Sequence, residues 1–130
     1  MQGMGEIMII LPWPDKKLSP NARTHWASKA KAVKSARNAA GWATRACGVR
    51  INGDGAIDLH ITFYPPDNRS RDTDNLLASC KGILDGVADG LGVNDSRFIL
   101  HIGRGEVRKG GQVLITWGES LIKESTPIPF

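Results

Sequence analysis

The sequence has few cysteines, no long apolar run and, over a wide stretch, no acidic residue. Only two cysteines occur among 130 residues, and Cys47 and Cys80 form no Cys-x-x-Cys pair, so neither a disulfide scaffold nor a zinc site is indicated. No apolar stretch approaches the roughly 18 residues of a membrane-spanning helix, and the N-terminus lacks the pattern of a secretory signal. We therefore expect one soluble domain in the cytoplasm, with both cysteines reduced in its core.

The missing acids concentrate the positive charge in one part of the chain. No acidic residue stands between Asp15 and Asp54, although the whole chain has 17 basic and 13 acidic residues. A merely solvated helix face usually mixes opposite charges at spacing i, i+4. An unopposed basic stretch instead favours contact with a polyanion such as nucleic acid. The residues that we expect to contact phosphates here are Lys16, Lys17, Arg23, Lys29 and Lys31.

The middle of the chain carries the acids that most suggest a chemical site. Arg69 and Arg71 stand directly before Asp72 and Asp74. Two carboxylates two positions apart, with Asp95 in a later Gly-rich turn, supply the oxygen ligands that Mg²⁺ or Mn²⁺ prefers. Helix capping is the alternative, in which Asp72 or Asp74 accepts backbone N–H bonds at a helix N-terminus and holds no metal.

A single amphipathic helix is predicted after these acids, because apolar residues recur at helical spacing from Leu76 to Leu91 within about 120° of arc. On this helix Asp74, Lys81 and Asp85 fall within about 40° of one another, beside the apolar arc. A glycine stripe faces away from the core and would either admit the backbone of another chain or only weaken the helix. It consists of Gly82, Gly86 and Gly90.

The remaining patterns predict four strands and a second helix. Residues 6–11 form an apolar run typical of a strand buried on both faces, and residues 26–47 predict an Ala-rich amphipathic helix. Residues 57–64 alternate like a strand with one face on the core. Residues 98–102 and 113–117 predict two strands that form a hairpin across a basic, Gly-rich turn.

The predicted fold class is therefore α/β (α+β). We expect a small mixed sheet of about four strands packed with two helices, in the order β-α-β-α-β-β. The whole chain, residues 1–130, is expected to be one domain, with a flexible tail from about residue 119.

Taken together, these segments resemble the RusA family of Holliday junction resolvases of phages and prophages. The resemblance covers most of the chain, and the block around the paired acids is its most specific part. The matching residues are Leu11-Pro-Trp-Pro, Leu18-Ser-Pro-Asn-Ala-Arg-Thr-His-Trp26, Pro65-Pro66, Arg71-Asp72-Thr-Asp74-Asn75-Leu76, and then Lys81, Asp85 and Asn94-Asp95.

The resemblance implies a homodimeric, Mg²⁺-dependent endonuclease that cuts four-way DNA junctions, with Mn²⁺ expected to substitute. It implies a metal site of Asp72, Asp74 and Asp95, which are catalytic together with Lys81. The family's lysine commonly stands three residues after Asn75, where this chain has Ala78, so Lys81 is the nearest basic residue for that role. The supporting residues are Asn75 and Asp85, and Arg69 and Arg71 join the expected phosphate contacts.

Two other functions remain open on the sequence. One is a less selective Mg²⁺ nuclease that acts on flaps or RNA. The other is a module that binds branched DNA by shape and charge without catalysis. The displaced Lys81, with Ala78 at the usual position, and the lone Asp95, where the family often has paired acids, keep this alternative open.

Overall fold

The computed structural model describes residues 6–49, 51 and 53–118. The predicted fold class and element order are confirmed, with a third helix. The strands are β1 (Glu6–Pro12), β2 (Ile57–Tyr64), β3 (Phe98–Arg104) and β4 (Gln112–Gly118). The helices are α1 (Trp26–Ala46), α2 (Thr73–Ser79) and α3 (Lys81–Leu91), with short 3-10 turns η1 (Lys16–Leu18) and η2 (Asp95–Arg97). The flexible tail expected from residue 119 lies outside the described residues.

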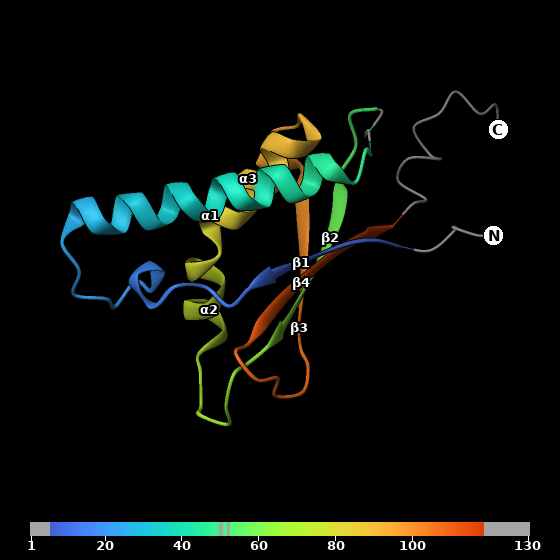
Figure 1. Ribbon diagram of the computed structural model, residues 1–130. Coiled ribbons are helices and arrows are strands. Elements are labelled where there is room, and N and C mark those ends of the chain that lie inside the picture. Colours follow the sequence, from blue (N-terminus) through green and yellow to red (C-terminus); the bar gives the residue numbers. More distant parts are fainter. Residues whose placement is uncertain (1–5, 50, 52, 119–130) are drawn as a thin grey trace.

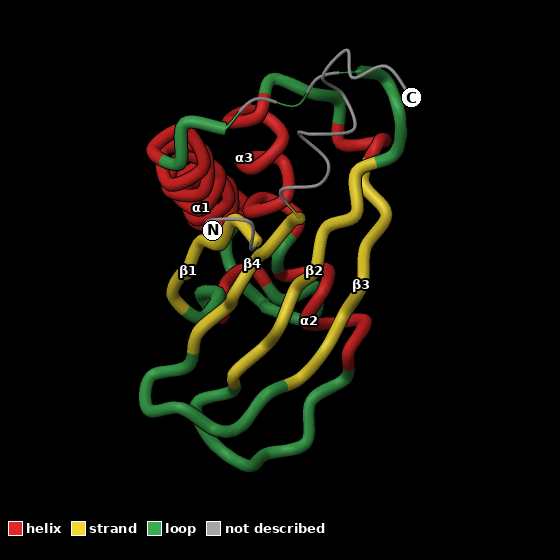
Figure 2. The backbone as a smooth tube through the Cα atoms, turned by 90° about the vertical axis from the view of Figure 1, so that its right-hand side faces the viewer, coloured by secondary structure: helices red, strands yellow, loops and turns green. Residues whose placement is uncertain are grey.

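The four strands form one mixed sheet in the order β1-β4-β2-β3, which runs from left to right in Figure 2. β4 is antiparallel to both β1 and β2, whereas β3 is parallel to β2 with His60 beside His101. The predicted hairpin of residues 98–102 and 113–117 is therefore wrong. Helices α2 and α3 carry the chain back across the sheet, as a parallel pair requires, and β4 takes the central position.

The helices lie to one side of the sheet (Figure 1), so one sheet face is core and the other is open. The predicted alternation of β2 is confirmed, because its buried and more exposed residues alternate along the strand. The prediction that the first strand is buried on both faces is wrong. Ile9 and Leu11 are buried, but Met8 and Ile10 are each 55% exposed, since no helix covers that face of the edge strand.

The single helix predicted over residues 76–91 is also wrong, because it breaks at Cys80 into α2 and α3. The Ser79 hydroxyl donates to the Asn75 carbonyl at 2.9 Å, and this contact competes with the backbone hydrogen bonds in the last turn of α2. The Cys80 N–H donates to the Leu77 carbonyl at 3.0 Å, which tightens this turn. The apolar pattern runs on unbroken because both helices pack against the same core. Burial there raises the pKa of the Cys80 thiol to about 12.

The glycine stripe of α3 packs against α1 of the same chain. A methyl group on Gly82 would lie 3.1 Å from the Val33 carbonyl oxygen, and one on Gly90 would lie 2.5 Å from Thr44 Cβ. A methyl group on Gly86 would overlap the Arg37 carbonyl oxygen. The stripe is thus neither a surface for another chain nor a weak helix end. It allows two helices to approach closely.

The packing against α3 begins near the middle of α1, at Val33, and continues through its C-terminal half. Its buried residues are Ala40, Gly41 and Thr44, and the Arg37 guanidinium binds the Asp89 carboxylate of α3 with N–O distances of 2.6 and 2.9 Å. The N-terminal half projects away from the sheet (Figure 1). None of the helices in the described part of the chain has the length and apolar character needed to cross a membrane.

Candidate functional site

A pocket of about 390 Å³ lies where α2 and α3 meet β3 and the turn η2. Its charged lining consists of Asp74, Lys81, Asp85 and Asp95. Three of these residues were predicted from the sequence to be catalytic, and Asp85 was predicted to support them. The pocket is otherwise apolar, with Leu77, Ala78, Leu84, Phe98 and Leu100 in its wall.

Three different local structures bring these charges together. Asp74 lies in the first turn of α2, and Lys81 and Asp85 lie one turn apart on α3, with 3.7 Å between Nζ and Oδ1. Asp95 begins η2, where the Asn94 side chain accepts the Ser96 N–H at 2.8 Å. The predicted alignment of Asp74, Lys81 and Asp85 therefore survives the helix break, because the break leaves all three on the same side.

Asp72 has a different position from the other acids. Its side chain accepts the Asp74 N–H at 2.8 Å and caps the N-terminus of α2, so the cap itself is confirmed for this residue. Asp72 and Asn75 line a neighbouring pocket of about 290 Å³, together with Lys16 and Arg71. The role of Asp72 as a metal ligand stays a prediction.

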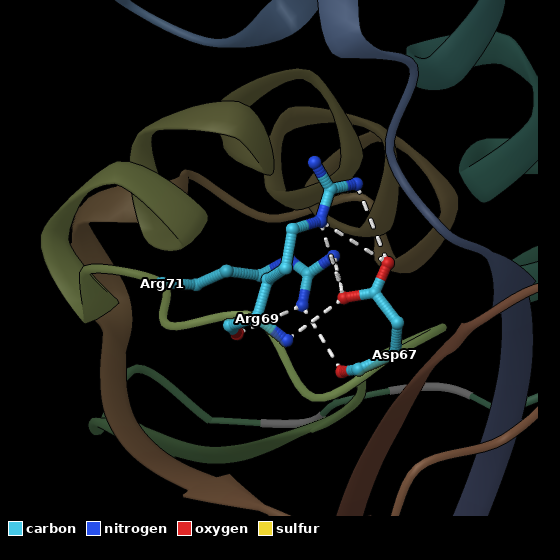
Figure 3. Close-up of polar contacts among 3 residues, drawn as sticks. All are labelled: Asp67, Arg69 and Arg71. Atoms are coloured by element: carbon cyan, nitrogen blue, oxygen red, sulfur yellow. Dashed lines mark hydrogen bonds and ion pairs between the residues drawn. The ribbon is translucent and has the colours of Figure 1, made fainter.

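The loop before α2 is folded around Asp67, as Figure 3 shows. Arg71 is held inside it: its guanidinium lies 2.9 Å from the Asp67 carboxylate, donates to two backbone carbonyls of the loop, and lies 5.5 Å from the centre of the Trp13 ring. The N–H of Arg69, followed by its guanidinium, lowers the pKa of Asp67 to about 2. Arg71 thus shapes the loop, whereas the Arg69 side chain is 81% exposed.

Arg104 helps to position the segment before α2, a role that the sequence did not identify. At the end of β3, its guanidinium donates to the Thr73 hydroxyl at 2.9 Å and also to the Arg71 carbonyl. It therefore joins β3 to the segment that holds Asp72 and Asp74. The contact spans 31 residues of sequence to Thr73, and no local pattern identifies such a partner.

Five of the seven predicted phosphate-binding residues gather around η1 and α1, apart from Arg69 and Arg71 in the loop before α2. Lys17 and Lys31 line a pocket of about 610 Å³ between residues 11–18 and α1. Lys16, Lys17 and Arg23 line another of about 460 Å³, and Lys29 is partly buried on α1. Within the described ranges no ion pair joins any of these five residues to an acid, so their charge is available to an outside partner.

The donor set of the acidic pocket suits Mg²⁺, because Asp74, Asp85 and Asp95 offer only hard oxygen ligands. No group of three or more His, Cys, Asp or Glu residues in the described part of the chain is arranged to enclose a metal ion. Mg²⁺ does not need such a cage, since one or two carboxylates, waters and substrate phosphates usually complete its shell. The donor chemistry of the pocket therefore suits a partly hydrated ion, whereas the described side chains alone form no three-ligand metal site.

Comparison with known proteins identifies a bacterial relative of this chain. No family model matches the chain. A protein of Xylella fastidiosa (strain Temecula1 / ATCC 700964), described as uncharacterized, is 47% identical over 116 residues, which cover 83% of this chain and 73% of that protein.

Proposed function

We propose a function for this chain, which belongs to the same family as the Xylella fastidiosa protein: a Mg²⁺-dependent endonuclease that is selective for branched DNA and resolves four-way junctions. One observation carries the proposal. Asp74, Lys81, Asp85 and Asp95, which come from three separate elements, line one pocket. The resemblance to RusA-type resolvases is consistent with it.

Hydrolysis of a phosphodiester needs an activated water and neutralisation of the charge that develops on the phosphate. A bound Mg²⁺ supplies both by lowering the pKa of a water and by acting as a Lewis acid. Asp74 and Asp95 would hold the ion, with Asp85 as a further oxygen donor. Lys81 would bind a non-bridging oxygen of the scissile phosphate and stabilise its negative charge. Its ion pair with Asp85, 3.7 Å long, keeps the ammonium group at the pocket.

The basic residues would hold the DNA on either side of the cut. Lys16, Lys17 and Arg23 lie around η1, while Lys29 and Lys31 lie on α1, and none of them lines the acidic pocket, so they would bind phosphates other than the scissile one. Arg69 adds an exposed cation beside α2. Affinity that depends on such contacts falls steeply as the salt concentration rises.

A homodimer in the bacterial cytoplasm completes the proposal. A four-way junction has two equivalent strands to cut, and a two-fold dimer offers two equivalent pockets. The glycine stripe of α3 is not available for this contact, because α1 covers it. The interface between the two copies of the chain must therefore use another surface.

The test is cleavage of a labelled, fixed four-way junction with and without Mg²⁺, with linear duplex as substrate control. We expect symmetric, Mg²⁺-dependent cuts in the junction alone. Asp74→Asn should lower the rate by at least about 100-fold, since it removes the charge of a metal ligand from the pocket. Asp54→Asn makes the same chemical change at an exposed turn outside the pocket and should leave the rate within about twofold.

Each other outcome counts against a definite part of the proposal. Tight junction binding without cleavage in Mg²⁺ or Mn²⁺ would identify a binding module instead. Equal cutting of flaps, RNA and junctions would contradict the junction selectivity. Full activity in Asp74→Asn would remove the acidic pocket from the reaction.

A further inference from the structure

Trp26 is the most exposed of the large hydrophobic residues in the described ranges. It begins α1, and 77% of its surface is accessible to solvent. The N-terminal half of α1 projects away from the sheet (Figure 1), and Trp26, its first residue, is not among the residues of the core cluster. A tryptophan left in water at this position forgoes the stabilisation that burial of its ring would give. It therefore calls for another role.

His25 holds the Trp26 ring in a defined arrangement. The two rings stack with their centres 5.7 Å apart and their planes 28° from parallel. His25 is itself fixed, because its Nδ1 accepts the Ala27 N–H at 3.2 Å and so caps the start of α1. With most of Trp26 exposed, these two rings form a short aromatic platform at the helix end.

A cationic pocket adjoins this platform along the chain. It has a volume of about 460 Å³, and Lys16, Lys17 and Arg23 line it together with Thr24, two residues before Trp26. Its other lining residues are Ser19, Asn21 and Ala22, so no carboxylate faces it. Three cations with hydroxyl and amide groups are chemically suited to phosphate oxygens.

Trp42 shows what the same residue type looks like on this helix without such surroundings. It is 69% exposed, but the Arg45 guanidinium lies over its ring, 5.4 Å from the ring centre. Neither tryptophan lines any of the cavities described above. The difference between them is that Arg23 and Thr24, which line the cationic pocket, directly precede His25 and Trp26 in the chain, whereas no lining residue of that pocket is near Trp42 in sequence.

We infer that Trp26 and His25 bind an unpaired base of DNA, while Lys16, Lys17 and Arg23 hold its neighbouring phosphates. Every base offers a face to an aromatic ring, but in a duplex these faces are already stacked. The platform therefore suits an unstacked nucleotide of single-stranded or branched DNA. This inference rests on the proposed function, since it gives the branched part of the substrate a binding place away from the acidic pocket.

The test measures binding of a fluorescent thymidine 12-mer and of a blunt duplex by anisotropy, in EDTA, so that cleavage does not interfere. Trp26→Ala should weaken binding of the single strand about tenfold, as expected for the loss of one stacked base. Trp26→Phe, which keeps a ring, and Trp42→Ala, the matched control on the same helix, should both stay within about twofold of the wild type. Duplex binding should change less than twofold in all three variants.

The phosphate half of the inference is tested by salt. Arg23→Gln should reduce the slope of log affinity against log salt by about 0.7 on the single strand, and an unchanged slope would overturn it. Circular dichroism of each variant checks that the fold is kept.

The base-binding half is overturned if Trp26→Ala binds the single strand as well as the wild type, or if Trp42→Ala loses as much affinity. Failure of this inference can be distinguished from failure of the proposed function. Mg²⁺-dependent junction cleavage with no role for Trp26 would leave the nuclease and remove the platform. Trp26-dependent binding without any cleavage would do the reverse.

Discussion

The packing of α3 on α1 allows a sharp prediction for Gly86. Replacing it with alanine would place a methyl group into the Arg37 carbonyl oxygen and 2.9 Å from Ala40 Cβ. Both obstacles are fixed parts of α1, so no side chain can rotate away. The helices must move apart instead, and overpacking of this kind costs about 1–3 kcal/mol.

A glycine-to-alanine change in a helix also brings a gain in helix propensity. Alanine is better than glycine in a helix interior by about 1 kcal/mol, so Gly86→Ala should lose up to about 2 kcal/mol of unfolding free energy in total. Gly41→Ala on α1 is the matched control. Its methyl group would lie 3.4 Å from the Gly86 carbonyl oxygen, a tolerable contact, so it should be neutral or up to about 1 kcal/mol more stable. Gly82→Ala, at 3.1 Å from the Val33 carbonyl oxygen, should fall between the two.

Urea unfolding followed by circular dichroism measures the free energy of unfolding of all three variants, and thermal unfolding gives their midpoints. Each lost kcal/mol should lower the thermal midpoint by about 4 °C for a domain of this size. The reasoning fails if Gly86→Ala is as stable as Gly41→Ala, because the close approach of the two helices would then not depend on the missing methyl group.

Two further predictions concern the segment before α2. The folded pKa of Asp67 is about 2 because of Arg69 and Arg71, below the value near 3.9 of an unfolded chain. Its carboxylate therefore stabilises the fold above about pH 4, and the stability advantage of the wild type over Asp67→Asn should vanish as the pH falls through about 2 in urea unfolding; a constant difference would contradict this. Asp72→Ala should cost about 1 kcal/mol of stability by removing the helix cap, whereas Asp72→Asn keeps a capping oxygen. Junction cleavage that survives in Asp72→Asn would show that its charge is not needed.

Most of the local structure could be predicted from the sequence, because it depends on neighbours in the chain. The alternation of residues 57–64 and the apolar stripe of α1 are such local signals. Strand partners are not local. The turn before β4 suggested a hairpin, but β3 pairs with β2 and β4 lies between β1 and β2. The break at Cys80 was also invisible, since the apolar period continues through it.

The candidate site follows the same division. Asp74, Lys81 and Asp85 were predicted to line up because they lie on neighbouring helical turns, and they line one pocket. The Arg104 contacts and the Arg37–Asp89 ion pair could not be predicted, because they join residues 31 and 52 positions apart. Asp72 and Asp74 are adjacent in the motif, yet they line different pockets, since the cap geometry turns them apart.

The central position of β4 has a consequence for how the protein is made. β4 follows the other three strands in the chain but lies between β1 and β2. A ribosome therefore releases β1 and β2 before the strand that joins them exists. Until residues 112–118 have emerged, β1 and β2 lack the strand that lies between them. The domain therefore cannot complete its fold while β4 is still being translated. A nascent chain stalled before β4 can pair β2 with β3 but cannot join β1 to them, so the four-stranded sheet should be complete only when β4 arrives.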